Sequence, residues 1–136
     1  CMAIDGYVSS LNATPVHNCS HAFGGLYHVP HGDANGVFLP IVMEALPELY
    51  IPSAERLAQA LNLPPSDKTG ADRLEDVIAR VRRLQAQTGC ATDLSRWKVK
   101  ADDMEQIMAA VASDPIAVFF PIPPEKIQEI TLKAIG

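Results

Sequence analysis

The sequence predicts an all-α domain, a helical bundle of about seven helices. Apolar residues recur at three- and four-residue intervals in one segment after another, and no segment shows the strict apolar–polar alternation of a strand. With 136 residues, 48% of them hydrophobic, the chain can build one domain around a hydrophobic core. The connections between the expected helices are short, so we expect consecutive helices to pack antiparallel.

The first two predicted helices are separated by a proline. An apolar helical pattern over residues 2–11 begins without a capping residue, so we expect this chain to be the downstream part of a longer protein. Thr14 and Pro15 form a start signal for the second helix. Gly24 and Gly25 are expected to end it.

The third predicted helix contains a proline. We expect Asp33 to cap its N-terminus after a turn-rich connection over residues 27–32. Pro40 lies within the apolar pattern that follows. A proline in an ordinary helix interior removes one backbone hydrogen bond and costs about 3 kcal/mol, so we expect either a kink or a packing partner there.

Two further helices follow. A short fourth helix is expected to begin at Pro52 and to end before the prolines at 64–65. Thr69, with Asp72 three residues later, resembles a capping box for the fifth helix. This helix has the cleanest amphipathic pattern in the chain, and Gly89 is expected to end it.

The last two predicted helices are bounded by prolines. Asp114 and Pro115 are expected to stop the sixth helix. Residues 116–121 are then interpreted as a short apolar crossing, and the final helix is expected over residues 123–136.

Composition and charge disfavour several classes of partner. Eleven Lys and Arg against sixteen Asp and Glu give a net charge of -5, and no basic run is present, so we expect no nucleic-acid binding. No stretch approaches the roughly 18 apolar residues of a membrane helix, and the N-terminus does not resemble a signal peptide, so we expect a cytoplasmic protein without membrane contact. The three cysteines match no zinc-site spacing and are expected to be reduced thiols.

All four histidines lie between His17 and His31. His17 and His21 are four residues apart on a predicted helix, so both side chains share one face and could chelate one metal ion. His31, in a proline-glycine turn, is a third candidate. The alternative is that these histidines lie at the edge of the core and bond to the backbone. A zinc protease is disfavoured because Asn18 stands where its general-base glutamate would follow the first histidine.

Residues 15–40, PVHNCSHAFGGLYHVPHGDANGVFLP, resemble the signature of the iron-containing (group III) alcohol dehydrogenases, written VHxxxHxLGGxYxxPHGxANAxLLP. The resemblance is specific over residues 12–42, and elsewhere it is loose, in the helical layout and in the surroundings of Thr88-Gly89 and Asp102-Asp103. The matching residues are His17, His21, Gly24, Gly25, Pro30, His31, Gly32, Ala34, Asn35, Leu39 and Pro40.

The resemblance implies a specific division of roles. In this family an N-terminal Rossmann-like domain binds NAD(P), and an all-helical C-terminal domain binds Fe(II), or sometimes zinc or another divalent ion, through one Asp and three His. His17 and His31 match the two downstream metal ligands. His21 then becomes a catalytic histidine that relays the hydroxyl proton or orients the substrate, rather than the second ligand that helical spacing favours. His28 falls at a variable position and is expected on the surface.

The implied activity is metal-assisted hydride transfer between a small alcohol or aldehyde and NAD(P). The family's upstream Asp-x-x-x-His ligands are absent, because Ser9 is the residue four after Asp5, and the glycine-rich dinucleotide loop is absent too. We therefore interpret residues 1–136 as a partial C-terminal domain, inactive alone, with the NAD(P)-binding domain as its missing partner. Apolar faces left without that partner are expected to favour a homo-oligomer. The alternative function is a non-catalytic helical fragment with a structural or subunit-association role.

Overall fold

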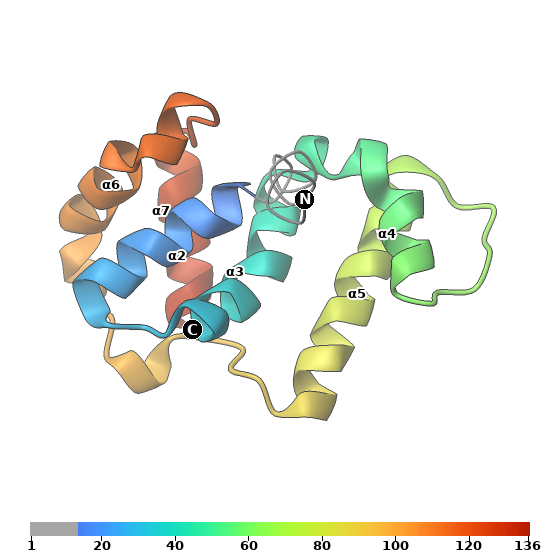
Figure 1. Ribbon diagram of the computed structural model, residues 1–136, viewed down its shortest axis with the longest axis horizontal. Helices are drawn as coiled ribbons and strands as arrows, with labels where there is room; N and C mark the ends of the chain where they lie inside the picture. The colour runs from blue at the N-terminus through green and yellow to red at the C-terminus, as the bar shows by residue number, and fades with distance from the viewer. Residues whose placement is uncertain (1–13) are drawn as a thin grey trace, which may run out of the picture.

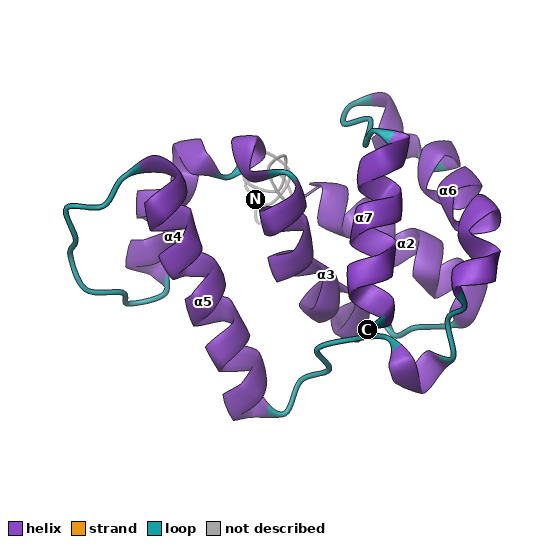
Figure 2. Cartoon of the chain, turned by 180° about the vertical axis from the view of Figure 1, so that it is seen from behind, coloured by secondary structure: helices purple, strands orange, loops and turns teal. Residues whose placement is uncertain are grey.

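The computed structural model describes residues 14–136, and the helix predicted over residues 2–11 lies outside this range. Within residues 14–136 the regular structure is entirely helical (Figure 2). The predicted all-α class is therefore confirmed.

Six α-helices and five short 3-10 helices form the described part of the chain. The α-helices are α2 (Thr14–Tyr27), α3 (His31–Ala45), α4 (Ala54–Ala60), α5 (Gly70–Thr88), α6 (Met104–Ser113) and α7 (Pro124–Ile135). The 3-10 helices are η1 (Pro47–Leu49), η2 (Ile51–Ser53), η3 (Ser95–Trp97), η4 (Ala101–Asp103) and η5 (Pro115–Val118).

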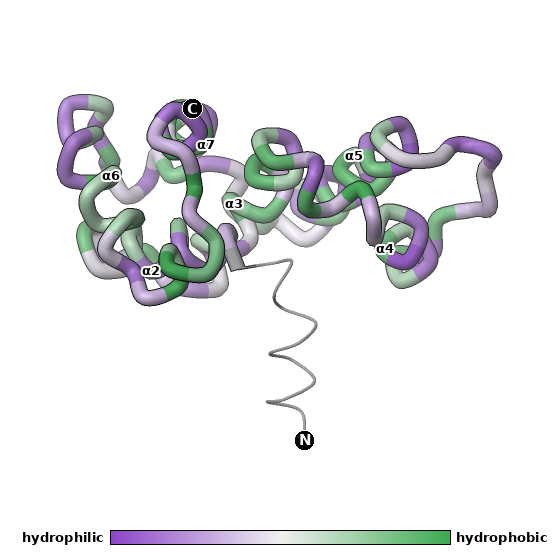
Figure 3. The backbone as a smooth tube through the Cα atoms, turned by 90° about the horizontal axis from the view of Figure 1, so that it is seen from above, coloured by the Kyte–Doolittle hydropathy of each residue, from purple (hydrophilic) through white to green (hydrophobic). Residues whose placement is uncertain are grey.

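Helix α3 lies at the centre of the arrangement (Figure 1). It contacts α2 and α7 on one side and α5 on the other. Helix α6 packs against both α2 and α7 and so joins them into one group, and α4 and α5 form a hairpin that lies beside α3. Viewed from above, the α4–α5 hairpin and the α2–α6–α7 group lie on opposite sides of α3 (Figure 3).

The core is built around the apolar face of α3. Its buried residues are Ala34, Val37, Phe38, Pro40, Ile41, Val42, Met43 and Ala45. The ring of Phe38 lies 4.9 Å from that of Phe23 on α2, centroid to centroid. Burying a phenylalanine side chain contributes about 1.5–3 kcal/mol, so this pair makes a major contribution to holding α2 against α3.

Pro40 lies inside α3, and the helix continues beyond it to Ala45. The side chain of Pro40 is buried in the core. The buried side chain agrees with one of the two expectations for Pro40, a packing partner rather than a kink.

Two predicted helix boundaries near the histidines are wrong. Helix α2 does not end at Gly24 and Gly25, and it continues until His28 takes a left-handed conformation with φ 56°. The backbone N–H of His28 still donates to the Gly24 carbonyl at 3.1 Å, because glycine can keep helical geometry when tertiary packing supports it. Asp33 is not the cap of α3: Pro30 precedes the helix, which begins at His31 and has Asp33 in its first turn.

The boundaries of α5 match the prediction better. Thr69 is its N-cap residue, but its side chain forms no capping hydrogen bond, so the predicted capping box is not formed. Gly89 ends the helix with φ 70°, a left-handed conformation that glycine adopts without steric cost.

The later boundaries also fall near the expected prolines. Helix α6 ends at Ser113, one residue before Asp114, and α7 begins at Pro124. The segment over residues 116–121, interpreted as a crossing, is instead largely the 3-10 helix η5 and the turn after it.

Within the described residues, no single helix is both long and apolar enough to cross a membrane. Only the stretches His31–Ala45 and Pro47–Ala60, bent by 100° against each other, meet the length and composition criteria when taken together.

Candidate metal centre

Three of the four histidines converge at one point. His17 and His21 come from α2, and His31 is the first residue of α3. The ring centroids lie 6.1 Å apart for His17 and His21, 5.2 Å apart for His17 and His31, and 5.4 Å apart for His21 and His31. His28, in the connection between the helices, is exposed, as expected from its variable position in the signature.

The connection between α2 and α3 explains this convergence. Residues 28–30 form the whole connection, with His28 left-handed and Pro30 in an extended conformation at φ -58° and ψ 135°. These backbone angles turn the chain, so that the first residue of α3 lies against the face of α2 that carries His17 and His21. The four-residue spacing of His17 and His21 on α2 and the tight turn before His31 together bring the three rings close to one another.

Two polar side-chain contacts hold α2 against neighbouring elements near the cluster. The hydroxyl of Ser20 lies 2.7 Å from Oδ1 of Asn35 on α3. At the C-terminal end of α2, Tyr27 donates its hydroxyl hydrogen to Asp103 Oδ2 at 2.9 Å. Burial, together with this bond to a carboxylate, raises the pKa of Tyr27 to about 12, so the phenol stays protonated and keeps donating.

The electrostatics of the cluster favour neutral imidazole at His31. Partial desolvation by the surrounding residues lowers the pKa of His31 although its side chain is exposed, and positive charge at His17 or His21 would lower it further. Neutral imidazole is the form that binds a metal ion, since a proton would otherwise occupy the nitrogen lone pair.

His17 supplies a second observation that fits metal binding. Its Nδ1 is buried and has no hydrogen-bond partner in the described part of the chain. A buried polar atom left without a partner costs about 1–3 kcal/mol, and a metal ion or a further donor would remove that cost. Imidazole nitrogens suit iron, zinc and similar divalent ions, so the donor set fits the ion that the family resemblance implies.

The histidine cluster does not by itself form a full metal site within the described residues. Among residues 14–136, no group of three or more His, Cys, Asp and Glu side chains has the arrangement needed to hold a metal ion. Catalytic metal sites usually have three or more protein ligands.

Asp114 is a site residue that sequence reasoning missed. Its Oδ2 lies 3.0 Å from His21 Nδ1, and its side chain is only 10% exposed. Its other oxygen, Oδ1, accepts the backbone N–H of Ile116 at 2.8 Å and so caps η5. The sequence indicated a helix stop at this position, but nothing in it indicates a partner 93 residues away.

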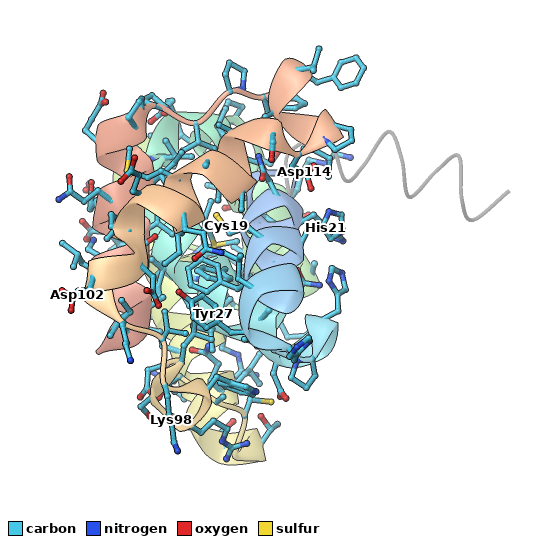
Figure 4. All side chains as sticks on the ribbon, turned by 90° about the vertical axis from the view of Figure 1, so that its left-hand side faces the viewer. Cys19, His21, Tyr27, Lys98, Asp102 and Asp114 are labelled. Atoms are coloured by element: carbon cyan, nitrogen blue, oxygen red, sulfur yellow. The ribbon has the colours of Figure 1, made fainter. Side chains whose placement is uncertain are left out.

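Figure 4 shows that His21 and Cys19 lie on different sides of α2. His21 points away from the bundle on the side where Asp114 lies, and Cys19 points inward. Burial raises the pKa of the Cys19 thiol to about 12, so the thiol stays protonated and is a poor metal ligand. Neither Cys19 nor Cys90 forms a disulfide within the described residues.

Comparison with known proteins places these residues in a wider context. The model of the Fe-containing alcohol dehydrogenase family, C-terminal, matches residues 3–135. The 1,3-propanediol dehydrogenase of Klebsiella pneumoniae is 32% identical over 109 residues, covering 78% of this chain and 27% of that protein. Alcohol dehydrogenase 4 of Saccharomyces cerevisiae (strain YJM789) is 30% identical over 119 residues, covering 86% of this chain and 30% of that protein.

A solved structure shares the fold as well. The crystal structure of a 1,3-propanediol oxidoreductase superposes with a TM-score of 0.73 at 29% identity, covering 89% of this chain and 32% of that one. The chain thus spans less than a third of the length of these relatives.

Proposed function

The chain belongs to the iron-containing alcohol dehydrogenase family, whose C-terminal model it matches over residues 3–135, and from this premise we propose that it carries part of the catalytic centre of a metal-dependent alcohol dehydrogenase. The proposed reaction is hydride transfer between a small alcohol or aldehyde and NAD(P). The observation that carries the proposal is the convergence of His17, His21 and His31, with ring centroids 5.2–6.1 Å apart, at the junction of α2 and α3.

We assign His17 and His31 as ligands of the ion, Fe(2+) or alternatively zinc or another divalent metal. An N-terminal NAD(P)-binding domain, which the family resemblance implies, is proposed to supply the remaining ligands and the nicotinamide site. When bound, the ion supplies Lewis acidity toward the oxygen of the substrate.

His21 is proposed to handle the hydroxyl proton. Its side chain is 45% exposed, so a substrate can reach it, and its Nδ1 faces the carboxylate of Asp114 at 3.0 Å. With Nδ1–H donated to Asp114, the lone pair at Nε2 is free to accept a proton. Asp114 is in turn held by the Ile116 backbone N–H, so the carboxylate fixes both the orientation and the tautomer of the ring.

The proposal is tested on the enzyme that also contains the NAD(P)-binding part. We expect stoichiometric divalent metal and alcohol-dependent reduction of NAD(P), followed as absorbance at the nicotinamide band, with loss of both after treatment with a chelator. Retained activity after complete metal removal would contradict the metal-dependent mechanism. A purified enzyme with neither metal nor activity, even after addition of Fe(2+) or Zn(2+), would favour the non-catalytic alternative.

Replacing Asp114 by asparagine tests its role as a positioning residue. The amide can donate to His21 Nδ1 and so favours the tautomer with the proton on Nε2, where it blocks proton acceptance. We expect kcat to fall by about 100-fold, at the lower end of typical general acid–base contributions, with a changed pH profile and unchanged metal content.

Asp103→Asn is the matched control, because its amide oxygen can still accept the Tyr27 hydroxyl hydrogen and the residue does not contact a histidine ring. It should leave kcat and the pH profile unchanged. The ¹⁵N shifts of the His21 ring report the tautomer independently of activity. An Asp114→Asn variant with the wild-type tautomer and pH profile would show that the contact is only structural.

A further inference from the structure

A cleft lies beside the loop that joins α4 and α5, and its lining residues come from this loop and from α5. Figure 1 shows this loop on the α4–α5 side of the molecule, away from α2. It has a volume of about 380 Å³, within the range of small-molecule sites. Its lining residues are Leu63, Pro64, Pro65, Ser66, Lys68, Arg73, Asp76, Ala79, Arg80 and Arg83. None of them belongs to α2 or α3, so the cleft is separate from the histidine cluster.

The charge of this cleft is opposite to that of the whole protein. Four of its lining side chains are cationic and one is a carboxylate, in a chain of net charge -5. A concentration of one charge in a concave site raises the local concentration of ions of opposite sign. The cleft is therefore suited to an anion.

Two of the cationic side chains that line the cleft already have partners. The buried guanidinium of Arg73 donates through Nε to Glu55 Oε2 at 2.8 Å and through Nη2 to the Pro64 carbonyl at 3.0 Å. Asp76 Oδ1 accepts from Lys68 Nζ at 2.7 Å. These bonds fix the loop against α5 and satisfy the local charges, so they shape the cleft rather than bind a ligand.

The other two cationic side chains of the cleft have no such partners in the described part of the chain. Arg80 and Arg83 form no ion pair within residues 14–136, and Arg80 makes only a long Nε contact of 3.4 Å to the Leu61 carbonyl. Their i, i+3 spacing places them side by side on α5. Planar guanidinium groups match the oxygens of a phosphate in geometry and charge.

The part of this loop at residues 63–65 is apolar. Leu63, Pro64 and Pro65 line the cleft together with the two guanidinium groups. A ligand held here by its anionic group would place its organic part against these three side chains. This combination fits a monoester of phosphate better than the free ion.

We propose that this cleft binds a small phosphate monoester, with Arg80 and Arg83 holding the phosphate and the loop at residues 63–65 contacting the organic part. This assignment is independent of the proposed dehydrogenase function, because it uses no residue of the histidine cluster.

Isothermal titration of the purified protein with phenyl phosphate and with inorganic phosphate, at low ionic strength, tests the proposal. Phenyl phosphate should bind about fivefold more tightly than inorganic phosphate, because its ring buries apolar surface. Arg80→Ala and Arg83→Ala should each weaken phenyl phosphate binding about tenfold through loss of a charge-assisted hydrogen bond. Arg96→Ala removes an exposed arginine outside the cleft and should leave the affinities for phenyl phosphate and inorganic phosphate unchanged.

Three results would overturn the proposal. The first is that neither probe binds. The second is that Arg96→Ala loses as much affinity as the two cleft variants, which would indicate a general charge effect. The third is equal affinity for the two probes, which would exclude the contact with the organic part. Circular dichroism of each variant, together with the milder Arg80→Gln and Arg83→Gln replacements, separates loss of binding from loss of folding.

Discussion

Replacing His31 by alanine is expected to abolish tight binding of a divalent metal ion in the enzyme that contains the NAD(P)-binding part. His31 lies 5.2 Å from His17 between ring centroids, and its lowered pKa favours the neutral imidazole that a metal requires. Loss of a residue that merely supports a ligand costs about 10–100-fold in metal affinity, so loss of a ligand should cost at least about 100-fold. Elemental analysis and competition with a metal-binding dye measure this change.

His28→Asn is the matched control within the same short segment. His28 is exposed and has φ 56°, a left-handed conformation that asparagine tolerates better than alanine. This variant should keep the wild-type metal affinity. Full metal content in His31→Ala would exclude His31 as a ligand.

The equivalent change at His21 separates the two proposed roles. His21→Ala should retain the metal and lose turnover, since the residue is assigned to proton handling. Loss of metal in this variant would instead make His21 a ligand, as helical spacing on α2 alone favoured. The ring distances bring all three histidines together, so the assignment of His17 and His31 as the ligands rests on the family signature.

The sequence predicted the fold class and the part of the site that local spacing determines. Helical periodicity indicated α5 and its end at Gly89, because an amphipathic stripe followed by a left-handed glycine is a local signal. The pairing of His17 and His21 on one face of α2 was also predicted from a local signal, their four-residue spacing. His31 was a third candidate from its proline-glycine turn, and the signature made it a predicted ligand; the structure shows the turn that brings its ring to the pair.

Features that depend on contacts between distant segments could not be predicted in this way. Asp114 carries an ordinary helix-stop signal, and only packing of α2 against η5 gives it His21 as a partner. Gly24 and Gly25 predicted a helix end, but α2 is held against α3 and stays helical through them. The arginine-lined cleft likewise depends on where the loop at residues 63–68 crosses α5.

Replacing Phe38 by alanine is expected to destabilise the fold by about 3–5 kcal/mol, the usual cost of truncating a buried phenylalanine. Phe38 is fully buried on α3, and its ring packs 4.9 Å from Phe23 on α2. Its loss removes both the buried apolar area and the aromatic pair. Urea unfolding followed by circular dichroism measures the change in the free energy of unfolding.

Phe119→Ala serves as the matched control, because the side chain of Phe119 is 70% exposed on the described surface. A surface substitution of this kind usually changes stability by less than about 0.5 kcal/mol. If Phe38→Ala does not fold, the milder Phe38→Leu variant can be measured in its place.

Because the Phe23–Phe38 contact holds α2 against α3, Phe38→Leu should also weaken metal binding, although Phe38 is not assigned as a ligand. Unchanged stability in both Phe38 variants would mean that α2 and α3, and with them His17 and His31, are held together by other contacts.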